Sequence, residues 1–96
     1  DELFWQSEHT IRYGGGENLY GADEILAFRN ARPSSGLERT LSRTVITTYG
    51  NDFATASTLF ERETAPGKSG RQMQTWVRMA DGWRVVAAHV SVIDTP

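Results

Sequence analysis

Arginine is the residue type in this sequence best suited to bind a small anion, and one arginine interrupts a short run typical of a strand. Arg12 lies between Ile11 and Tyr13. A guanidinium group presents its N–H donors as a planar fork that matches the two oxygens of a carboxylate. Arg12 therefore either points to solvent, as an exposed strand arginine does, or enters a cavity and binds a carboxylate.

Two further arginines fall on an amphipathic helical segment, on the same face as Ile25 and Phe28. The aliphatic stems of Arg29 and Arg32 can pack on this face while their charged ends reach water and offset the negative end of the helix dipole. For Arg29, a position in a ligand pocket is an equal alternative. For Arg32, which precedes Pro33, we favour the packing role.

Gln74 and Trp76 are candidate ligand-binding residues on a predicted strand. They share a strand face with Gln72 and Arg78. Buried amides need hydrogen-bond partners, so a face of this composition is unusual for a purely apolar core. It either lines a polar cavity with an aromatic wall or faces solvent or a second subunit.

Tyr20, His89 and Ser91 complete the set of candidate ligand-binding residues. The Tyr20 hydroxyl can donate to a ligand, although a tyrosine in such a position is more often a half-buried packing residue. His89 and Ser91 share a mainly apolar strand face. A histidine there is more often a hydrogen-bonded core residue than a general base, and no carboxylate to orient it is apparent, so no nucleophilic role follows.

Motifs of the common catalytic and metal-binding classes are absent from the sequence. It contains no Ser-His-Asp order, HExxH, CxxC, P-loop or GxGxxG motif. The run Gly14-Gly15-Gly16 predicts a turn, because neither a helix nor a lysine follows it directly. Two histidines and no cysteine do not make a metal site. We therefore expect neither a metal nor an organic cofactor.

Both helical and strand signals are present to position these residues. Apolar spacing predicts a helix over Ala22–Arg32, with Asp23 and Glu24 in its first turn and Pro33 at its end. One short strand is predicted at His9–Tyr13 and four long ones at Leu37–Tyr49, Phe53–Glu63, Arg71–Met79 and Trp83–Ile93. Short turns, including Asp81-Gly82, join the long strands into an antiparallel meander, which the helix covers on one face.

Both faces of the last predicted strand are largely apolar. Simple alternation assigns Trp83, Val85, Ala87, His89 and Ser91 to one face and Arg84, Val86, Ala88, Val90 and Val92 to the other. A strand that is apolar on both sides is covered on both sides. The helix supplies one cover, and we expect a second subunit to supply the other, which predicts a homodimer formed through the sheet.

Size and charge restrict the class of protein. The 96 residues suffice for a single domain over 1–96. Acidic and basic residues are interspersed and the net charge is −2, so the chain lacks the basic surface that nucleic acid requires. No apolar run approaches the roughly 20 residues that span a bilayer. The chain begins with Asp1 rather than Met, and cytoplasm is the default compartment that we expect.

Two stretches resemble a known superfamily. The hairpin that runs from Gln74-Thr75-Trp76-Val77-Arg78 to Asp81–Ser91 resembles the C-terminal hairpin of SnoaL-like, nuclear-transport-factor-2-like (NTF2-like) domains. The upstream run from Thr10-Ile11-Arg12-Tyr13-Gly14 to Arg32-Pro33 is similar to the AtzH-like group, which includes HpxZ-like oxalurate-catabolism proteins. The resemblance implies an α+β, cystatin-like fold in which a curved antiparallel sheet, a cone or half-barrel, wraps around one helix.

The resemblance also bears on the site. The arginine of Thr-Ile-Arg-Tyr-Gly is a pocket position in AtzH-like proteins, which makes Arg12 the candidate catalytic residue. Members of the superfamily normally begin with one or two helices that close the open end of the cone, and group members have an aromatic hydroxyl on the first. This chain starts where the second helix would finish, so we expect these N-terminal helices to be missing.

Two classes of function remain. The resemblance implies a cofactor-independent enzyme that hydrolyses or decarboxylates a small ureido or dicarboxylate compound in nitrogen-heterocycle catabolism. Arg12 would then clamp a carboxylate and stabilise developing negative charge. The alternative is a non-catalytic, dimeric ligand-binding or assembly module. The shortened start favours this alternative, because the exclusion of water from a reaction needs a lid.

Overall fold

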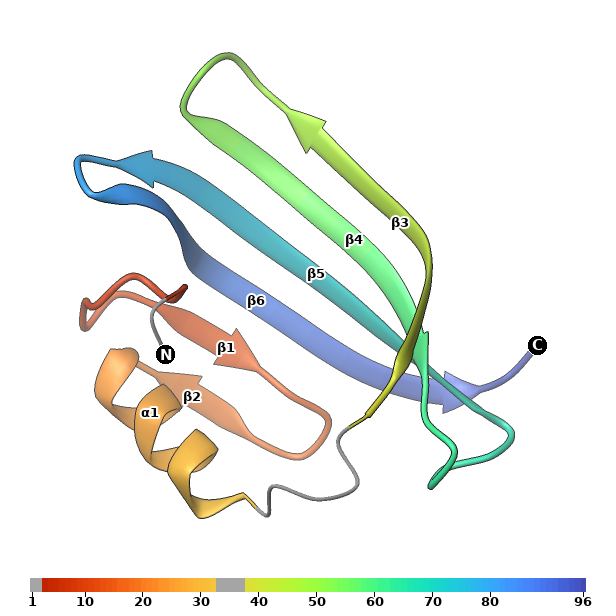
Figure 1. Ribbon diagram of the computed structural model, residues 1–96. Coiled ribbons are helices and arrows are strands. Elements are labelled where there is room, and N and C mark those ends of the chain that lie inside the picture. Colours follow the sequence, from red (N-terminus) through yellow and green to blue (C-terminus); the bar gives the residue numbers. More distant parts are fainter. Residues whose placement is uncertain (1–2, 33–37) are drawn as a thin grey trace.

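The computed structural model describes residues 3–32 and 38–96 as one curved sheet with a helix on its inner side (Figure 1). The sheet has the strand order β2-β1-β6-β5-β4-β3. All neighbouring strands are antiparallel except β1 and β6, which are parallel. The elements are β1 (Ile11–Tyr13), β2 (Asn18–Tyr20), α1 (Ala22–Ala31), β3 (Thr40–Thr48), β4 (Phe53–Glu61), β5 (Lys68–Met79) and β6 (Gly82–Asp94). The predicted α+β fold, a helix against an open, curved antiparallel sheet, is confirmed.

The four long strands form the predicted meander. Gly50, in the β3–β4 turn, has a φ angle of 74°, and Gly82, the first residue of β6 after the β5–β6 turn, has a φ angle of 119°. Both values favour glycine. β5 begins at Lys68, three residues before the predicted start at Arg71, because Lys68 and Ser69 continue the ladder with β6. Sequence analysis did not predict β2, which has only three residues. The start of the predicted strand at Leu37 lies outside the described residues.

The assignment of faces in β6 is wrong because the strand contains a bulge. Trp76 and Thr75 are consecutive in β5 but pair with Val85 and Ala87 of β6, so Val86 has no partner in the ladder. Val85 and Ala88, three residues apart, consequently share one core. Simple alternation placed Val85 on the face of Ala87 and His89, whereas the bulge moves it to the opposite face.

The described part of α1 ends at Ala31, one residue before its predicted end, and Arg32 continues in extended geometry. Gly21 precedes the helix with φ 90°, a conformation that favours glycine. Ile25 is 1% exposed and packs in the core, and Phe28 lies against this core. Leu26, which follows Ile25 in the helix, is exposed. The described helix is too short to cross a membrane, and no other helix of residues 3–32 and 38–96 qualifies.

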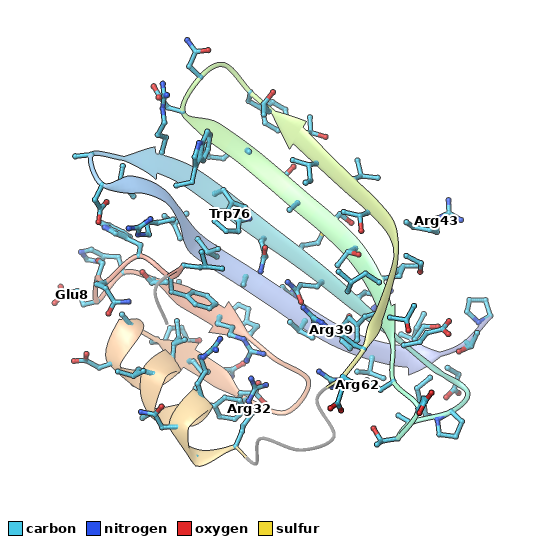
Figure 2. The ribbon with its side chains drawn as sticks, viewed as in Figure 1. Glu8, Arg32, Arg39, Arg43, Arg62 and Trp76 are labelled. Carbon is cyan, nitrogen blue, oxygen red and sulfur yellow. The ribbon has the colours of Figure 1, made fainter. Side chains whose placement is uncertain are left out.

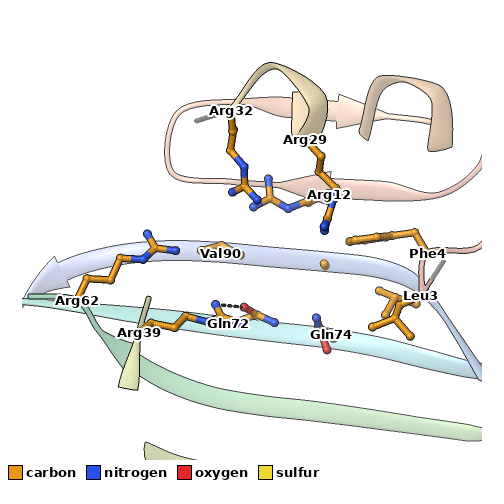
Figure 3. A pocket seen from close by; sticks show the side chains of 12 residues that line it. Leu3, Phe4, Arg12, Arg29, Arg32, Arg39, Arg62, Gln72, Gln74 and Val90 are labelled. Carbon is orange, nitrogen blue, oxygen red and sulfur yellow. Dashed lines mark hydrogen bonds between the residues drawn. The ribbon is translucent and has the colours of Figure 1, made fainter. Parts of the chain in front are cut away.

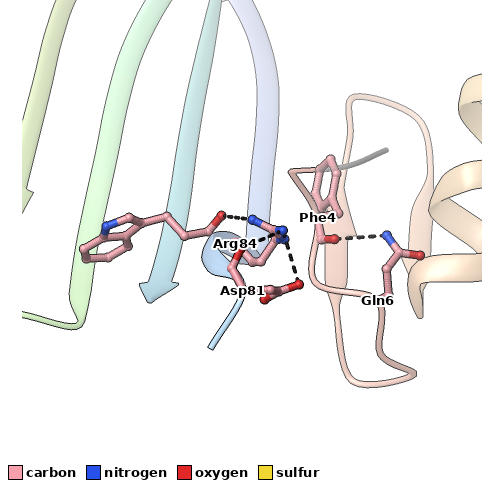
Figure 4. Close-up of polar contacts among 5 residues, drawn as sticks. Phe4, Gln6, Asp81 and Arg84 are labelled. Atoms are coloured by element: carbon pink, nitrogen blue, oxygen red, sulfur yellow. Dashed lines mark hydrogen bonds and ion pairs between the residues drawn. The ribbon is translucent and has the colours of Figure 1, made fainter. Parts of the chain in front are cut away.

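The segment before β1 is fixed along β6. Trp5 N–H donates to the Val85 carbonyl at 2.9 Å, and Val85 N–H donates to the Leu3 carbonyl at 2.7 Å. The Gln6 amide donates to the Phe4 carbonyl at 3.0 Å (Figure 4). Phe4 thereby enters the core beneath α1, together with Leu19, Ile25, Val85 and Ala88.

The register defines two faces of the sheet. The inner face is the one that α1 covers, and it includes the aligned residues Arg12, Ala88 and Gln74. The outer face is the opposite one, and it includes the next aligned set, which is Tyr13, His89 and Met73. A side chain's face therefore decides whether it can reach a site beneath α1.

Candidate functional site

A cavity of about 330 Å³ lies between α1 and the inner face of the sheet (Figure 3). Among the described residues, its lining consists of five arginines, two glutamines and five apolar side chains. They are Arg12, Arg29, Arg32, Arg39, Arg62, Gln72, Gln74, Leu3, Phe4, Val85, Ala88 and Val90. We call this space the arginine cavity.

The five arginines come from separate elements and converge because the sheet curves. Arg12 projects from β1 on the inner face, and Arg29 and Arg32 come from the last turn of α1 and its C-cap. Arg39 immediately precedes β3 and Arg62 immediately follows β4, whose ends pair through Thr40 and Glu61. Arg39 and Arg62 approach from the sheet side, opposite Arg32 (Figures 2 and 3).

A partly buried ion pair fixes Arg12. Its Nη1 donates to Oε2 of Glu17 at 2.8 Å, and the two side chains are 16% and 23% exposed. Gly14 leaves room for this contact, since a Cβ there would lie 1.6 Å from Oε2 of Glu17. The glycine run thus has a role beyond that of a turn. The ion pair uses Nη1 of Arg12, which leaves the remaining guanidinium donors for a ligand.

Two phenyl rings support four of the guanidinium groups. The guanidinium carbons of Arg12 and Arg32 lie 5.6 and 5.7 Å from the centre of the Phe28 ring. Those of Arg39 and Arg62 each lie 5.0 Å from the centre of the Phe60 ring. Such cation–π contacts partly offset the repulsion between like charges.

The electrostatics of the cavity are those of an anion site. Burial, followed by the charges of Arg12, Arg29 and Arg62, lowers the pKa of Arg32 below its usual value. Burial, followed by the charges of Arg62 and Arg32, lowers the pKa of Arg39 in the same way. Because an anion would favour the charged form of both groups, its binding would oppose these shifts.

Some hydrogen-bond donors of the cavity arginines also have no acceptor among the described residues. The Nε atoms of Arg32 and Arg62 are buried without a hydrogen-bond partner. Within residues 3–32 and 38–96, no carboxylate forms an ion pair with Arg32, Arg39 or Arg62. A buried donor without a partner costs free energy, which a bound acceptor would recover.

The structure brings four of the candidate site residues together. Arg12, Arg29 and Gln74 line the arginine cavity. Trp76 Nε1 donates to Oε1 of Gln74 at 3.0 Å, and the indole packs against the core beside the cavity (Figure 2). Gln74 and Trp76 therefore share a face, as predicted, and the indole orients the amide.

Tyr20, His89 and Ser91 lie on the outer face, away from the arginine cavity. The Tyr20 and Tyr13 hydroxyl oxygens are 3.3 Å apart, a hydrogen bond that is the main cause of the raised pKa of Tyr20. The Tyr13 ring meets His89 edge-to-face at 6.0 Å. Ser91 accepts a hydrogen bond from Nε of Arg71 at 3.1 Å. His89 and Ser91 border a separate depression of about 340 Å³.

Sequence reasoning missed Arg39 and Arg62, named Gln72 only as a neighbour of Gln74 on a face that could line a polar cavity, and assigned Arg32 a packing role. The signal for Arg39 and Arg62 was present, because one precedes and the other follows two strands that form a hairpin. The distance in space between Arg39 and Arg62 depends on the register of that hairpin, and the sequence pattern does not define this register. Oε1 of Gln72 accepts a hydrogen bond from Nη1 of Arg39 at 3.0 Å, which joins this glutamine to the set.

Clusters of metal-binding side chains are not found in the described part of the chain. Groups of three or more His, Cys, Asp or Glu side chains that could hold a metal ion do not occur there. The donors around the arginine cavity are cationic or amide groups, which suit an anionic ligand and not a metal ion.

Comparison with known proteins places the fold in a family. The model of the AtzH-like family matches residues 1–96. No curated protein matches the chain. A protein of unknown function from Pectobacterium atrosepticum has 66% sequence identity and a TM-score of 0.93, over 97% of this chain and 72% of that one. A cystatin-like fold protein from Burkholderia xenovorans has 50% identity and a TM-score of 0.91, over 98% of this chain and 74% of that one.

More distant structures share the fold alone. An NTF2-like protein of unknown function from Shewanella oneidensis has 21% identity and a TM-score of 0.75, over 94% of this chain and 78% of that one. Its likeness supports the NTF2-like, cystatin-like architecture predicted from the sequence. The chemistry of this chain therefore has to be argued from its own side chains.

Proposed function

The chain belongs to the AtzH-like family, and on that premise we propose that it binds a small carboxylate-bearing molecule in the arginine cavity. The observation that supports this most strongly is the convergence of five arginines on one cavity, with buried Nε donors on Arg32 and Arg62. Its volume of about 330 Å³ suits a small metabolite. Arg12, oriented by Glu17, is the group that clamps the carboxylate.

The reaction that we propose for this site is the hydrolysis or decarboxylation of a ureido or dicarboxylate compound, as the family resemblance implies. The described lining can stabilise negative charge that develops on such a substrate, through its guanidinium and amide donors. In this mechanism Arg12 holds the carboxylate, and Gln74, oriented by Trp76, contacts the ureido group.

A non-catalytic ligand-binding module is the second candidate function, and one observation favours it. The described residues that line the cavity include no His, Asp, Glu, Cys, Ser or Tyr. A general acid or base must come within hydrogen-bond reach of the proton that it transfers. Incubation of the protein with ureidoacetate separates the two candidates, because only an enzyme releases ammonia or carbon dioxide.

Calorimetric titration with ureidoacetate tests the binding proposal itself. Loss of a charge-assisted hydrogen-bonded pair should weaken binding to Arg12→Gln by about 10- to 100-fold. Arg43→Gln is the matched control, because Arg43 is an exposed arginine that points away from the cavity (Figure 2). It should bind as the wild type does. Equal affinities for all three proteins would refute the role of Arg12.

A further inference from the structure

One wall of the arginine cavity has features that binding at Arg12 does not explain. Arg39 and Arg62 lie on this wall, on the sheet side, and both contact the ring of Phe60. They flank a hairpin, so the pairing of Thr40 with Glu61 brings them together. We call Arg39, Arg62 and Gln72 the sheet-side cluster.

The cluster is built around a ring that has no freedom to move toward β5. Phe60 is 4% exposed and pairs across the sheet with Gly70. A Cβ on Gly70 would lie 2.1 Å from Cζ of the Phe60 ring, so the ring occupies the space of the missing side chain. The ring is therefore fixed, and with it the platform against which the Arg39 and Arg62 guanidinium groups lie.

The positive charges of Arg39 and Arg62, which lie against the Phe60 ring, are not neutralised by a carboxylate of the described residues. Nε of Arg62 is buried without a hydrogen-bond partner. No carboxylate of residues 3–32 and 38–96 pairs with Arg39 or Arg62. Gln72 accepts from Arg39 through its carbonyl oxygen, which leaves its amide N–H groups to donate. All the unused groups of the cluster are thus hydrogen-bond donors.

We propose that the sheet-side cluster is a second anion subsite, which binds the second anionic group of the same ligand whose carboxylate Arg12 clamps. This inference rests on the proposed function and adds the residues that recognise the far end of the ligand. Arg32 lies between the two subsites and interacts electrostatically with Arg12 on one side and Arg62 on the other. A ligand with one anionic group at each end would satisfy the donors on both sides of the cavity.

A matched pair of ligands tests the subsite. Succinate and succinamate have the same length, but an uncharged amide replaces one carboxylate in succinamate. The wild type should bind succinate at least about tenfold more tightly, because a charged acceptor makes stronger hydrogen bonds to guanidinium groups. Calorimetric titration of both ligands into the wild type, Arg62→Gln, Arg39→Gln, Arg12→Gln and the Arg43→Gln control measures the ratio.

Loss of either cluster arginine should reduce this ratio toward one, because it should weaken the binding of succinate far more than that of succinamate. Arg12→Gln should weaken both ligands, and Arg43→Gln should change neither. Thermal unfolding of each unliganded variant checks that the variant is folded. Arg39→Gln and Arg62→Gln provide two separate tests of the same subsite. An equal loss of affinity for both ligands in Arg39→Gln and Arg62→Gln would overturn the inference.

Two other outcomes separate this inference from the proposed function. If the wild type binds both ligands equally and Arg12→Gln weakens both, the second subsite is refuted and the proposed function stands. If succinamate does not bind the wild type, the carboxylate clamp at Arg12 itself is refuted. Inorganic phosphate is the last probe, because phosphate that binds alongside saturating succinate would show an independent anion site and overturn the inference.

Discussion

At the scale of single residues, the site depends on how two phenyl rings hold positive charge. Phe28 and Phe60 each contact a pair of guanidinium groups, one pair on the helix side and one on the sheet side. An aromatic ring adds attraction without a negative charge, so it supports the arginines while leaving them able to bind an anion. Glycine residues make room for these arrangements at positions 14 and 70.

Substitution of Gly70 should disturb both stability and binding. Gly70→Ala places a methyl group in the space of the Phe60 ring, and overpacking of this kind costs about 1–3 kcal/mol. The shifted ring would also displace Arg39 and Arg62. Gly15→Ala is the matched control, since no atom lies within 4 Å of its added Cβ, and its effect should stay within about 0.5 kcal/mol.

Urea unfolding measures the free energy of unfolding of both variants, and succinate titration reports on the cluster. Equal stability of Gly70→Ala and Gly15→Ala would contradict the close approach of Phe60 to Gly70. If Gly70→Ala is destabilised but binds succinate normally, the Phe60 ring does not determine the positions of Arg39 and Arg62.

Some of the site was predictable at this scale. Arg12 and Gln74 could be selected because a polar side chain within a strand needs either solvent or a polar cavity. Arg39 and Arg62 lie within the predicted strands but could not be selected, because their proximity depends on hairpin register and sheet curvature. His89 and Ser91 were named as candidates because they are polar residues on one largely apolar strand face, and the sequence pattern does not define which face of the sheet lines the cavity.

At the scale of elements, irregular positions in the strands decide which side chains meet. The bulge at Val86 places Val85 and Ala88 on the inner face and leaves His89 on the outer face. Alternation within a strand reveals faces only while its register is continuous, and the sequence around Val86 contains no glycine to mark the interruption. The helix and the hairpin turns were predictable because they depend on local signals such as Asp81-Gly82.

A second irregularity, in β3, stores strain that can be measured. Arg43 has φ 49°, in the left-handed region, where the register of β3 with β4 shifts between Ser42 and Val45. Arg43→Gly should raise the free energy of unfolding by about 0.5–1 kcal/mol, because relief of the left-handed strain exceeds the entropic cost of glycine.

Thr47→Gly serves as the control for that substitution. Thr47 lies in the same strand and does not have a positive φ, so glycine there should lower stability. Urea unfolding checks both variants. A loss of stability in Arg43→Gly equal to that in Thr47→Gly would contradict the strained conformation at Arg43.

At the scale of the whole molecule, the two faces of the sheet differ in how they are covered. α1 and the N-terminal segment cover part of the inner face. The outer face exposes Tyr13, Phe53 and Met73, at 36%, 42% and 52%. We propose that a second copy of the chain covers this face, since no helix of residues 3–32 and 38–96 covers these side chains, and exposed apolar side chains in a patch typically mark an interaction surface.

The mass of the protein in solution tests this proposal. Light scattering at micromolar concentration should give twice the chain mass of 10.7 kDa. Met73→Arg should shift the protein toward the monomer, because a charge would be buried in the interface. The conservative variant Met73→Leu should remain dimeric. A monomeric wild type would contradict a homodimer formed through the sheet.

The binding of a carboxylate in the arginine cavity is tested most directly by NMR of the arginine Nε–Hε groups during titration with ureidoacetate. Nε of Arg32 is buried without a hydrogen-bond partner, and Arg12 is the clamp, whereas Arg43 lies outside the cavity. The Arg12 and Arg32 resonances should shift together and saturate, and the Arg43 resonance should not move. Saturable shifts at exposed arginines alone, or none at all, would contradict a carboxylate site in this cavity.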